Sequence, residues 1–457
     1  MDYIPHTPAE IETMLRTIGV VSIEELLSDI PAEARCRSFD LPPGLAETDV
    51  LAELEQIALP NRSLRELGSF LGFGAYHHVI PTVVDAVSAR GEWLTPYTPY
   101  QAEASQGTLQ MIYEFQTLVC ELMQMDVANA SLYDGASALA EAALVALRSS
   151  GRSRLLVSEA IHPHARQVLS TYLSGFPSVI QQMPFRDGVT DLNAVKAAMG
   201  DDVAAVLMQQ PNVFGCLEPM AEAGRLAHDR GALFVASVYP ISLGELAPPG
   251  AYDADIAVAE GRCLGSPVAF GGPALGLFAA SESLLRRMPG RLSGCTVDQT
   301  GRRGFTLTLQ TREQHIRREK ATSNICTNQG WFALRATIFL SLLGPQGIRE
   351  LAEVNAERGH RLAERLVATG AVEPVFNQPF FNECTLRFRR GVDGRAIGRK
   401  LLKAGLLAGV DLRPWYPMLG EASVWCATEL NAQPQIDRLA EALRDAAQRA
   451  SNARKRS

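Results

Sequence analysis

The feature that most constrains the fold is a series of short apolar segments separated by amphipathic helical stretches between residues 152 and 280. Branched and small apolar residues follow one another directly in these segments, which are residues 154–160, 203–211, 232–240, 256–261 and 274–280. Strands that are apolar on both faces are typical of a mostly parallel sheet covered by helices on both sides. The pattern therefore predicts an α/β fold, and active sites in such folds gather at the carboxyl ends of the strands.

Helical patterns flank this central region. Residues 7–59 are amphipathic, with Thr7, Pro8 and Glu10 placed as cap, first-turn proline and acid, and the segment from Ser22 repeats the capping signal. Residues 107–125 carry apolar side chains at helical spacing, which predicts a long, largely buried helix. We expect a helical arm over residues 1–60, a large α/β domain over 61–330 and a small α+β domain over 331–457.

The small domain is expected from the pattern after Gly330. A long helical region is followed by a strand over residues 382–390, a helix over 394–404, a strand over 423–430 and a closing helix from Pro434.

Charge and cysteine usage exclude several classes of function. A formal charge of −7 and a pI near 5.7 give no positive field for nucleic acid or an anionic membrane surface. The sequence has no basic leader followed by an apolar run, and no stretch approaches the roughly 20 apolar residues that span a bilayer. The eight cysteines are scattered without a C-x-x-C pair, as expected for reduced thiols in a cytoplasmic protein.

Two polar segments are candidates for binding. Residues 97–107 concentrate hydroxyl, amide and carboxylate groups on Thr98, Tyr100, Gln101 and Glu103, between two prolines and a glycine. Loops of this kind on a rigid scaffold commonly line polar sites, although composition alone leaves an ordinary loop open.

The second polar segment covers residues 317–330 and includes Thr322, Ser323 and Asn324. Its small hydrogen-bonding residues lie between a basic helix end and a glycine. They could bind an anion or could bridge two domains, and chemistry alone leaves both readings open.

Other motifs favour structural roles. Asp134 precedes a predicted helix, and its carboxylate would occupy the backbone N–H groups that a phosphate would need. His77 and His78, and His162 with His164, have no carboxylate or cysteine set at metal-ligand spacing, so we expect no metal site. The chain contains no G-x-S-x-G elbow, and no G-x-G-x-x-G follows a predicted strand.

Four segments together resemble one enzyme family over nearly the whole chain. YTPYQAEASQG (97–107), NASLYDGASALAEA (129–142), FGGPALGLFAA (270–280) and REKATSNICTNQG (318–330) are similar to the P-protein of glycine decarboxylase, in the glycine cleavage system. The resemblance implies an aspartate-aminotransferase-like, fold-type I transferase dependent on pyridoxal phosphate (PLP). Its large domain would contain a mainly parallel seven-stranded sheet, with a smaller α+β domain at the C-terminal end.

The residues that should hold the cofactor depart from this family. The resemblance places the Schiff-base lysine at Arg262, before Ser266-Pro267 and the run Gly271-Gly272-Pro273, and a guanidinium is not a Schiff-base nucleophile. It also places Ser237 where an aspartate pairs with the pyridine nitrogen, and serine carries no charge for that pairing. With Asp134, three cofactor anchors are lost, so no residue of this chain alone is expected to be catalytic and no PLP to be covalently bound.

This pattern resembles the alpha subunit of split P-proteins, which would act as a subunit of glycine dehydrogenase (aminomethyl-transferring) in glycine catabolism. The implied partners are a PLP-carrying beta subunit in an α2β2 heterotetramer, glycine as substrate and the lipoylated H-protein. The resemblance implies that Thr98, Tyr100, Gln101 and Glu103 shape the partner's site, with a smaller share for the second segment at Thr322, Ser323 and Asn324.

Two alternatives stay open at this point. One is a stand-alone PLP enzyme of the aminotransferase kind that uses an unrecognised lysine; Lys320 is the one lysine of the second polar segment, but it lies well past the strand-end position expected for a Schiff-base lysine. The other is a non-catalytic regulatory homologue. The family often carries an acidic residue after the tyrosine of its G-x-G-x-Y segment, where this chain has His77-His78, so the role of that turn also stays open.

Overall fold

A computed structural model describes residues 5–36, 38, 40–272, 274–389 and 392–454, with side chains to residue 448. Two compact units are present, Met1–Arg62 and Ser63–Ser457, and each is described separately. Residues 1–4 of the predicted arm lie outside the described residues. Within the described ranges, no helix combines the length and apolar character needed to cross a bilayer.

The first unit contains the helices α1 (Pro8–Ile18), α2 (Ile23–Leu26) and α3 (Glu47–Ala58). The cap predicted at Thr7 is confirmed and forms a capping box, because the Thr7 hydroxyl accepts the Glu10 N–H while the Glu10 carboxylate accepts the Thr7 N–H at 2.7 Å. The helices do not form one continuous run, and none of them has a buried residue. Val50, Leu54 and Ile57 form an exposed apolar stripe on α3, as on surfaces that are covered in an assembly.

The second unit is built on a seven-stranded sheet. In spatial order its strands are β2 (Val127–Ala128), β10 (Gly276–Ala280), β9 (Ile256–Glu260), β8 (Leu233–Val238), β7 (Val203–Gln210), β3 (Arg154–Ser158) and β4 (Val179–Met183). The last five are parallel, and only β10 runs antiparallel to its neighbours. The predicted α/β class with a mainly parallel sheet is therefore confirmed.

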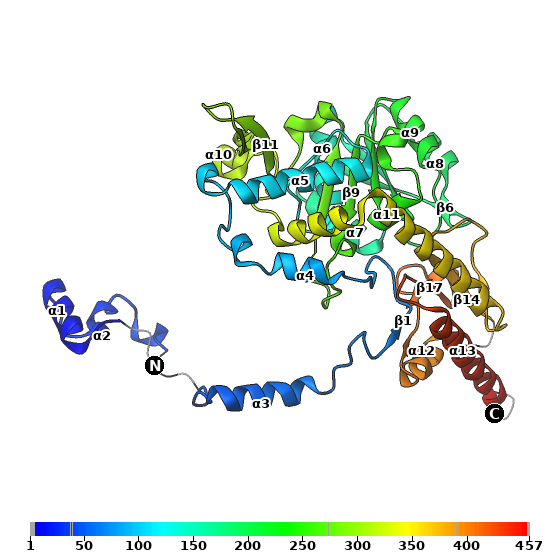
Figure 1. Cartoon of the computed structure of the whole chain (residues 1–457), viewed down its shortest axis with the longest axis horizontal. Coiled ribbons are helices and arrows are strands. Elements are labelled where there is room, and N and C mark those ends of the chain that lie inside the picture. The colour runs from blue at the N-terminus through cyan, green and yellow to red at the C-terminus, as the bar shows by residue number, and fades with distance from the viewer. Residues whose placement is uncertain (1–4, 37, 39, 273, 390–391, 455–457) are drawn as a thin grey trace. The chain divides into compact units, whose positions relative to one another are not determined.

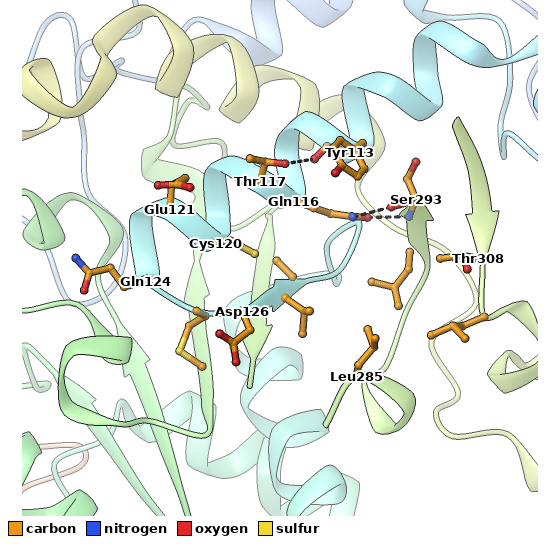
Figure 2. A pocket seen from close by; sticks show the side chains of 15 residues that line it. Tyr113, Gln116, Thr117, Cys120, Glu121, Gln124, Asp126, Leu285, Ser293 and Thr308 are labelled. Carbon is orange, nitrogen blue, oxygen red and sulfur yellow. Dashed lines mark hydrogen bonds between the residues drawn. The ribbon is translucent and has the colours of Figure 1, made fainter. Parts of the chain in front are cut away.

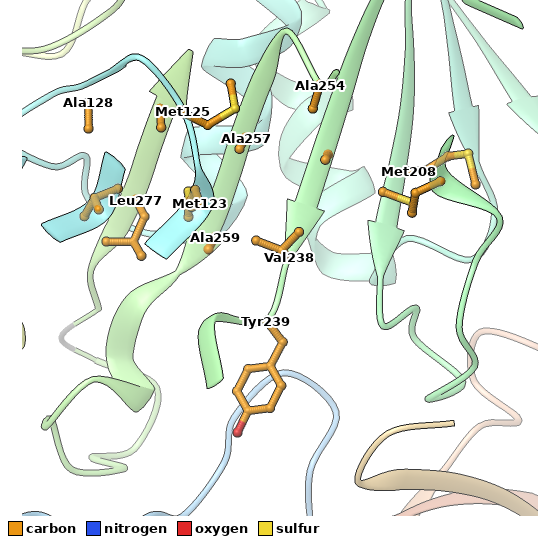
Figure 3. Close-up of a cluster of buried hydrophobic side chains, with 14 of the residues drawn as sticks. Met123, Met125, Ala128, Met208, Val238, Tyr239, Ala254, Ala257, Ala259 and Leu277 are labelled. Carbon is orange, nitrogen blue, oxygen red and sulfur yellow. The ribbon is translucent and has the colours of Figure 1, made fainter. Parts of the chain in front are cut away.

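Helices cover both faces of this sheet. Leu156, Met208 and Ala236 face a core shared with α5 (Gln106–Met123), α9 (Met220–His228) and α11 (Gly330–Val367), and Figure 3 shows part of it. The alternating residues Leu207 and Val235 face α6 (Gly135–Ser150) and α7 (Pro163–Leu173). In Figure 1, α5 and α11 cross the same side of the sheet, where they pack against each other. Burial on both faces explains why the strands are apolar at consecutive positions.

Several strands were not predicted. The edge strand β4 has the half-exposed sequence VIQQM, and β2 has only two residues, so neither carries the apolar signal of the other strands. The hairpin β11 (Leu292–Val297) and β12 (Arg303–Thr308) is exposed at its outer end.

A smaller four-stranded antiparallel sheet confirms the predicted α+β portion. Its order is β13 (Val372–Pro374), β14 (Glu383–Phe388), β17 (Ala422–Cys426) and β16 (Val410–Asp411), and α12 (Gly394–Lys403) and α13 (Gln433–Arg454) share its core with the fully buried Trp425. The other elements of this unit are α4 (Thr82–Ser88), α8 (Leu192–Ala198), α10 (Gln314–Arg317), the pair β1 (Gly68–Ser69) with β15 (Leu406–Leu407), and the pair β5 (Phe185–Arg186) with β6 (Val189–Thr190).

One long helix contributes to both cores. The first half of α11 packs with the large sheet through Phe339, and the second half packs with the small sheet through Leu362. The helix is kinked at Gly344, whose φ of 61° favours glycine, and Pro345 follows directly. The predicted domain limits at residues 60 and 330 stay predictions.

A buried glutamate joins the small sheet to the loop before α4. Glu383, at the start of β14, accepts the Phe73 N–H at 2.6 Å and the Tyr76 hydroxyl at 2.8 Å. Burial raises the pKa of Glu383 to about 7, because an ionised carboxylate is poorly solvated there. The folded protein therefore retains a proton that the unfolded chain releases near pH 4.5.

We predict that Glu383→Gln makes stability less dependent on pH. A pKa that is raised in the folded state costs nothing below the unfolded value and reaches its full cost once the pH exceeds the folded value. The amide mimics the neutral acid, so the free energy of unfolding of Glu383→Gln relative to wild type should rise from near zero at pH 4 to about 3 kcal/mol at pH 8. Urea unfolding across this range would measure it, with Glu353→Gln on the exposed face of α11 as control. A constant difference at all pH values would contradict the assignment.

Candidate functional site

The carboxyl edge of the parallel strands holds the positions at which the resemblance expects the cofactor. Ser237 is the second-last residue of β8 and lies opposite Val258 of β9. Arg262 lies in the 3₁₀ turn Gly261–Cys263 that directly follows β9. The two predicted replacement residues are thus on neighbouring strands at one edge, and Pro273, in the glycine-rich run beyond them, lies outside the described residues.

Two carboxylates occupy the N-terminus of α6, beside this edge. Asp134 accepts the Ser137 N–H at 2.8 Å and the Ser137 hydroxyl at 2.8 Å, which confirms that it caps the helix. Glu260 at the end of β9 accepts the Gly135 N–H at 3.1 Å. A Cβ at Gly135 would lie 2.7 Å from the Glu260 nitrogen, so only glycine allows this close approach. The helix end therefore presents negative charge where a phosphate needs donors.

Glu260 also organises the turn that carries Arg262. The same carboxylate accepts the N–H groups of Arg262 at 3.1 Å and Leu275 at 3.0 Å. Burial raises the pKa of Glu260, although these N–H donors and the Arg262 charge oppose the shift. The Arg262 Nε is itself buried without a hydrogen-bond partner in the described part of the chain. Sequence reading missed Glu260, because only its position beside a helix 125 residues away shows its role.

These residues do not fit a covalently bound PLP. The resemblance leads us to expect a lysine, an aspartate and a set of phosphate-binding N–H groups at this edge, whereas the structure has Arg262, Ser237 and a helix N-terminus paired with two carboxyl groups there. Ser237 also makes no side-chain hydrogen bond among the described residues.

His78 lies in a buried hydrogen-bonded group near the same edge. Its Nδ1 is 2.9 Å from Glu429, and its Nε2 contacts the Tyr239 hydroxyl two residues beyond Ser237. Burial raises the pKa of Glu429, but the hydrogen bond and charge of His78, together with hydrogen bonds from the Val79 N–H and Asn355, outweigh burial and bring this pKa below its ordinary value. Burial also lowers the pKa of His77. The structure therefore shows which residues His78 contacts, and these contacts could not be predicted from the sequence.

The first polar segment lies at the surface. The side chains of Gln101 and Glu103 are exposed and make no hydrogen bond within the described ranges. Tyr100 is 55% exposed, and its hydroxyl is 3.2 Å from Arg291 Nη2. The Thr98 Oγ1 is buried and has no partner among the described residues. Unpaired polar groups of this kind are unusual without a ligand, water or partner chain to satisfy them.

The second polar segment is more firmly held. The Thr322 carbonyl accepts a hydrogen bond from Arg148, and the Ser323 hydroxyl accepts the Ile325 N–H at 3.0 Å, whereas Asn324 is exposed. Tyr133 accepts the Cys326 N–H at 3.1 Å. Tyr100 of the first segment is linked to the second through Arg291, which also donates to Cys326 O and Thr327 Oγ1.

One cavity lies apart from these residues. An open groove of about 700 Å³ separates α5 from the β11–β12 hairpin, and Figure 2 shows Gln116 joined to Ser293 at its wall. None of the predicted site residues lines it. Within the described ranges, no group of three His, Cys, Asp or Glu side chains is arranged to hold a metal ion.

The comparisons with known proteins agree on one family. The family model of the glycine cleavage system P-protein matches residues 1–443. The probable glycine dehydrogenase (decarboxylating) subunit 1 of Moorella thermoacetica is 50% identical, covering 97% of this chain and 99% of that protein. The crystal structure of the glycine decarboxylase (P-protein) of the glycine cleavage system in inhibitor-bound form matches with a TM-score of 0.89 and 45% identity, over 98% of this chain and all of that one.

A more distant structure shares the fold alone. A C-DES mutant with glycine covalently linked to its PLP cofactor matches with a TM-score of 0.61 at 17% identity, over 84% of this chain and 97% of that one. This likeness supports the fold-type I assignment made from the sequence.

We predict that the cap at Asp134 is a measurable part of stability. Asp134→Ala leaves the Ser137 N–H unpaired and should lower the free energy of unfolding by about 1 kcal/mol. Asp134→Asn keeps a side-chain acceptor of similar capping strength and should cost less than about 0.5 kcal/mol. Chemical denaturation of the three proteins would measure both changes, and equal losses for the two variants would contradict capping by this side chain.

Proposed function

The chain belongs to the glycine cleavage system P-protein family, and from this premise we propose that it is the alpha subunit of a two-subunit glycine decarboxylase, glycine dehydrogenase (decarboxylating). The reaction would be decarboxylation of glycine with transfer of the remaining aminomethyl group to the lipoyl group of the H-protein. The observation that carries the proposal is the contrast at the carboxyl edge: the cofactor positions are filled by Asp134, Glu260 and Arg262, while the polar segment from Thr98 to Glu103 is largely unpaired.

We assign the PLP of this system to the partner subunit. The relative from Moorella thermoacetica is named a subunit 1, which implies a second subunit. A chain that presents two carboxylates at the would-be phosphate position, and an arginine at the lysine position, has no means of capturing this cofactor by itself. The partner would be a lysine-bearing beta subunit of the same fold in an α2β2 assembly.

The first polar segment is our candidate for the part of this chain that completes the partner's site. Gln101 and Glu103 are exposed and unpaired, and the buried Thr98 Oγ1 lacks a partner in the described ranges. Leaving a buried polar group unpaired costs about 1–3 kcal/mol, so a group retained in this state favours a role in an assembly. Thr322, Ser323 and Asn324 would contribute a smaller part, because most of their polar groups are already paired or lie at the surface.

The cellular setting follows from the same proposal. All eight cysteines are free, and Cys216, Cys263, Cys384 and Cys426 are buried. Such thiols would stay reduced in the cytoplasm, where we place the assembly.

The stand-alone alternative is disfavoured by the position of Lys320. This lysine is exposed in the 3₁₀ turn Arg318–Lys320, which belongs to the second polar segment and not to the turn after β9. A Schiff-base lysine in this fold follows a strand of the sheet, as Arg262 does here. The alternative of a non-catalytic homologue is distinguished by the variants described below.

We predict that the chain forms no covalent PLP adduct by itself. After incubation with PLP and reduction with borohydride, the isolated chain should show no specific adduct, and it should not catalyse glycine-dependent exchange of carbon dioxide. Mixing it with the beta subunit, PLP and lipoylated H-protein should restore exchange. Full activity of the isolated chain, or a stoichiometric adduct on Lys320, would contradict the division of labour.

We predict that the first polar segment contributes to turnover in the reconstituted complex. Tyr100→Phe and Glu103→Gln each remove one polar function at nearly constant volume, and each should lower kcat/KM for glycine at least tenfold, equivalent to about 1.4 kcal/mol. Tyr113→Phe on α5 and Glu353→Gln on α11 are matched controls and should leave the rate within twofold. Unchanged turnover in both test variants would favour a non-catalytic scaffold.

A further inference from the structure

We propose that Arg291 is a positioning residue, which holds Tyr100 of the first polar segment against Cys326 and Thr327 of the second so that both segments form one surface. The inference rests on the function proposed above for these segments, and it names a residue that no motif in the sequence points to. Arg291 lies directly before β11, far in sequence from Tyr100 and 35 residues from Cys326.

The contacts of Arg291 reach both segments at once. Nη2 is 3.2 Å from the Tyr100 hydroxyl and also donates to the Cys326 carbonyl, while Nη1 donates to Thr327 Oγ1 at 3.2 Å. The guanidinium carbon lies 5.5 Å from the centre of the Tyr100 ring, within the range of a cation–π contact. A single side chain thus fixes both the ring and the hydroxyl of Tyr100.

Glu313 and His315 close this arrangement on the other side. Glu313 Oε2 is 3.7 Å from Arg291 Nε and 3.6 Å from His315 Nδ1. The His315 ring packs edge-on against Tyr100, with 5.6 Å between the ring centres. Tyr100, Arg291, Glu313 and His315 therefore form a closed ring of contacts around the base of the first polar segment.

Burial makes the arrangement specific for arginine. The side chains of Arg291 and Glu313 are only 4% and 6% exposed. Because water cannot solvate them at this depth, each side chain needs the other and the surrounding polar groups as partners. A planar guanidinium can donate hydrogen bonds from three nitrogens in several directions at once. A lysine ammonium at the same depth carries all of its donors on one nitrogen. Arg291 Nε and Glu313 Oε1 still lack a hydrogen-bond partner among the described residues.

Tyr100 is the residue on which this ring acts. Its hydroxyl accepts a hydrogen bond from Arg291. Tyr100 is nevertheless 55% exposed, so its outer surface is free to contact whatever covers the segment. A side chain fixed in this way loses little conformational freedom when a partner subunit closes over it, which favours binding.

Hydrogen–deuterium exchange of the full chain tests the positioning role without any assay of activity. In Arg291→Lys, the amides of residues 97–107 and of residues 318–330 should both exchange several-fold faster than in wild type. The control is Arg154→Lys, a half-buried arginine paired with Asp202 at the opposite, amino end of the sheet, and it should change neither segment. Unchanged exchange in either segment of Arg291→Lys would overturn the proposal.

A double-mutant cycle in the reconstituted complex then tests whether Arg291 acts through Tyr100. Arg291→Lys and Tyr100→Phe should each lower kcat/KM for glycine at least tenfold. The kcat/KM of the double variant should be at most threefold lower than that of the less active single variant. Fully multiplicative losses would mean that the two residues act independently and would overturn the proposal. Thr327→Val removes a single acceptor of Arg291 and should lower kcat/KM for glycine two- to fivefold. This variant replaces Arg291→Lys in the test if Arg291→Lys accumulates poorly.

The two readouts separate this inference from the proposed function. A wild-type complex without glycine-dependent exchange would overturn the proposed function, while the deuterium exchange of the isolated chain would still decide whether Arg291 couples the two segments. Faster deuterium exchange in both segments combined with unchanged turnover would show that the coupling serves folding alone, and would overturn the positioning role.

Discussion

The rest of the structure depends on the burial of both faces of the parallel sheet. Side chains of β3, β7, β8 and β9 alternate between two apolar cores, one shared with α5, α9 and α11 and the other with α6 and α7. A polar group placed on either face would lose its hydrogen bonds to water. This loss costs several kcal/mol when no hydrogen bond within the protein replaces them. Chemistry is therefore confined to the strand ends and the loops that follow them, and the residues at these ends decide what the chain can do.

At that edge, electrostatics distinguishes this chain from one that binds a phosphate. A helix N-terminus has free N–H groups and a partial positive charge, which suit an anion from outside. In α6 the acceptors are the protein's own carboxyl groups, since Asp134 accepts the Ser137 N–H and Glu260 accepts the Gly135 N–H. The helix end of this fold therefore has its first N–H groups paired within the chain.

The sequence predicted those parts whose signal is local. The five central strands were found because each carries its apolar run within a few residues, and the caps at Thr7 and Asp134 were found because donor and acceptor are three residues apart. The edge strand β4 was missed because half of its residues face solvent. Glu260 and Arg291 could not be found in this way, since their partners lie 125 and 191 residues distant and only folding brings them together. The loop that contains Tyr100 was recognised by composition and resemblance, but not the residue that fixes it.

The turn after β9 is held by more than one residue. Arg262 is the visible departure, yet Glu260 accepts three N–H groups there, from Gly135, Arg262 and Leu275, and so ties the helix end, the turn and β10 to one buried carboxylate. Burial raises the pKa of Glu260, and the charge of Arg262 opposes this rise. A lysine at position 262 would still face a helix end that Asp134 and Glu260 fill, and removing Glu260 would leave three N–H groups unpaired. The arginine, the glutamate and the glycine at the helix end therefore form one interdependent structure that supports the sheet edge.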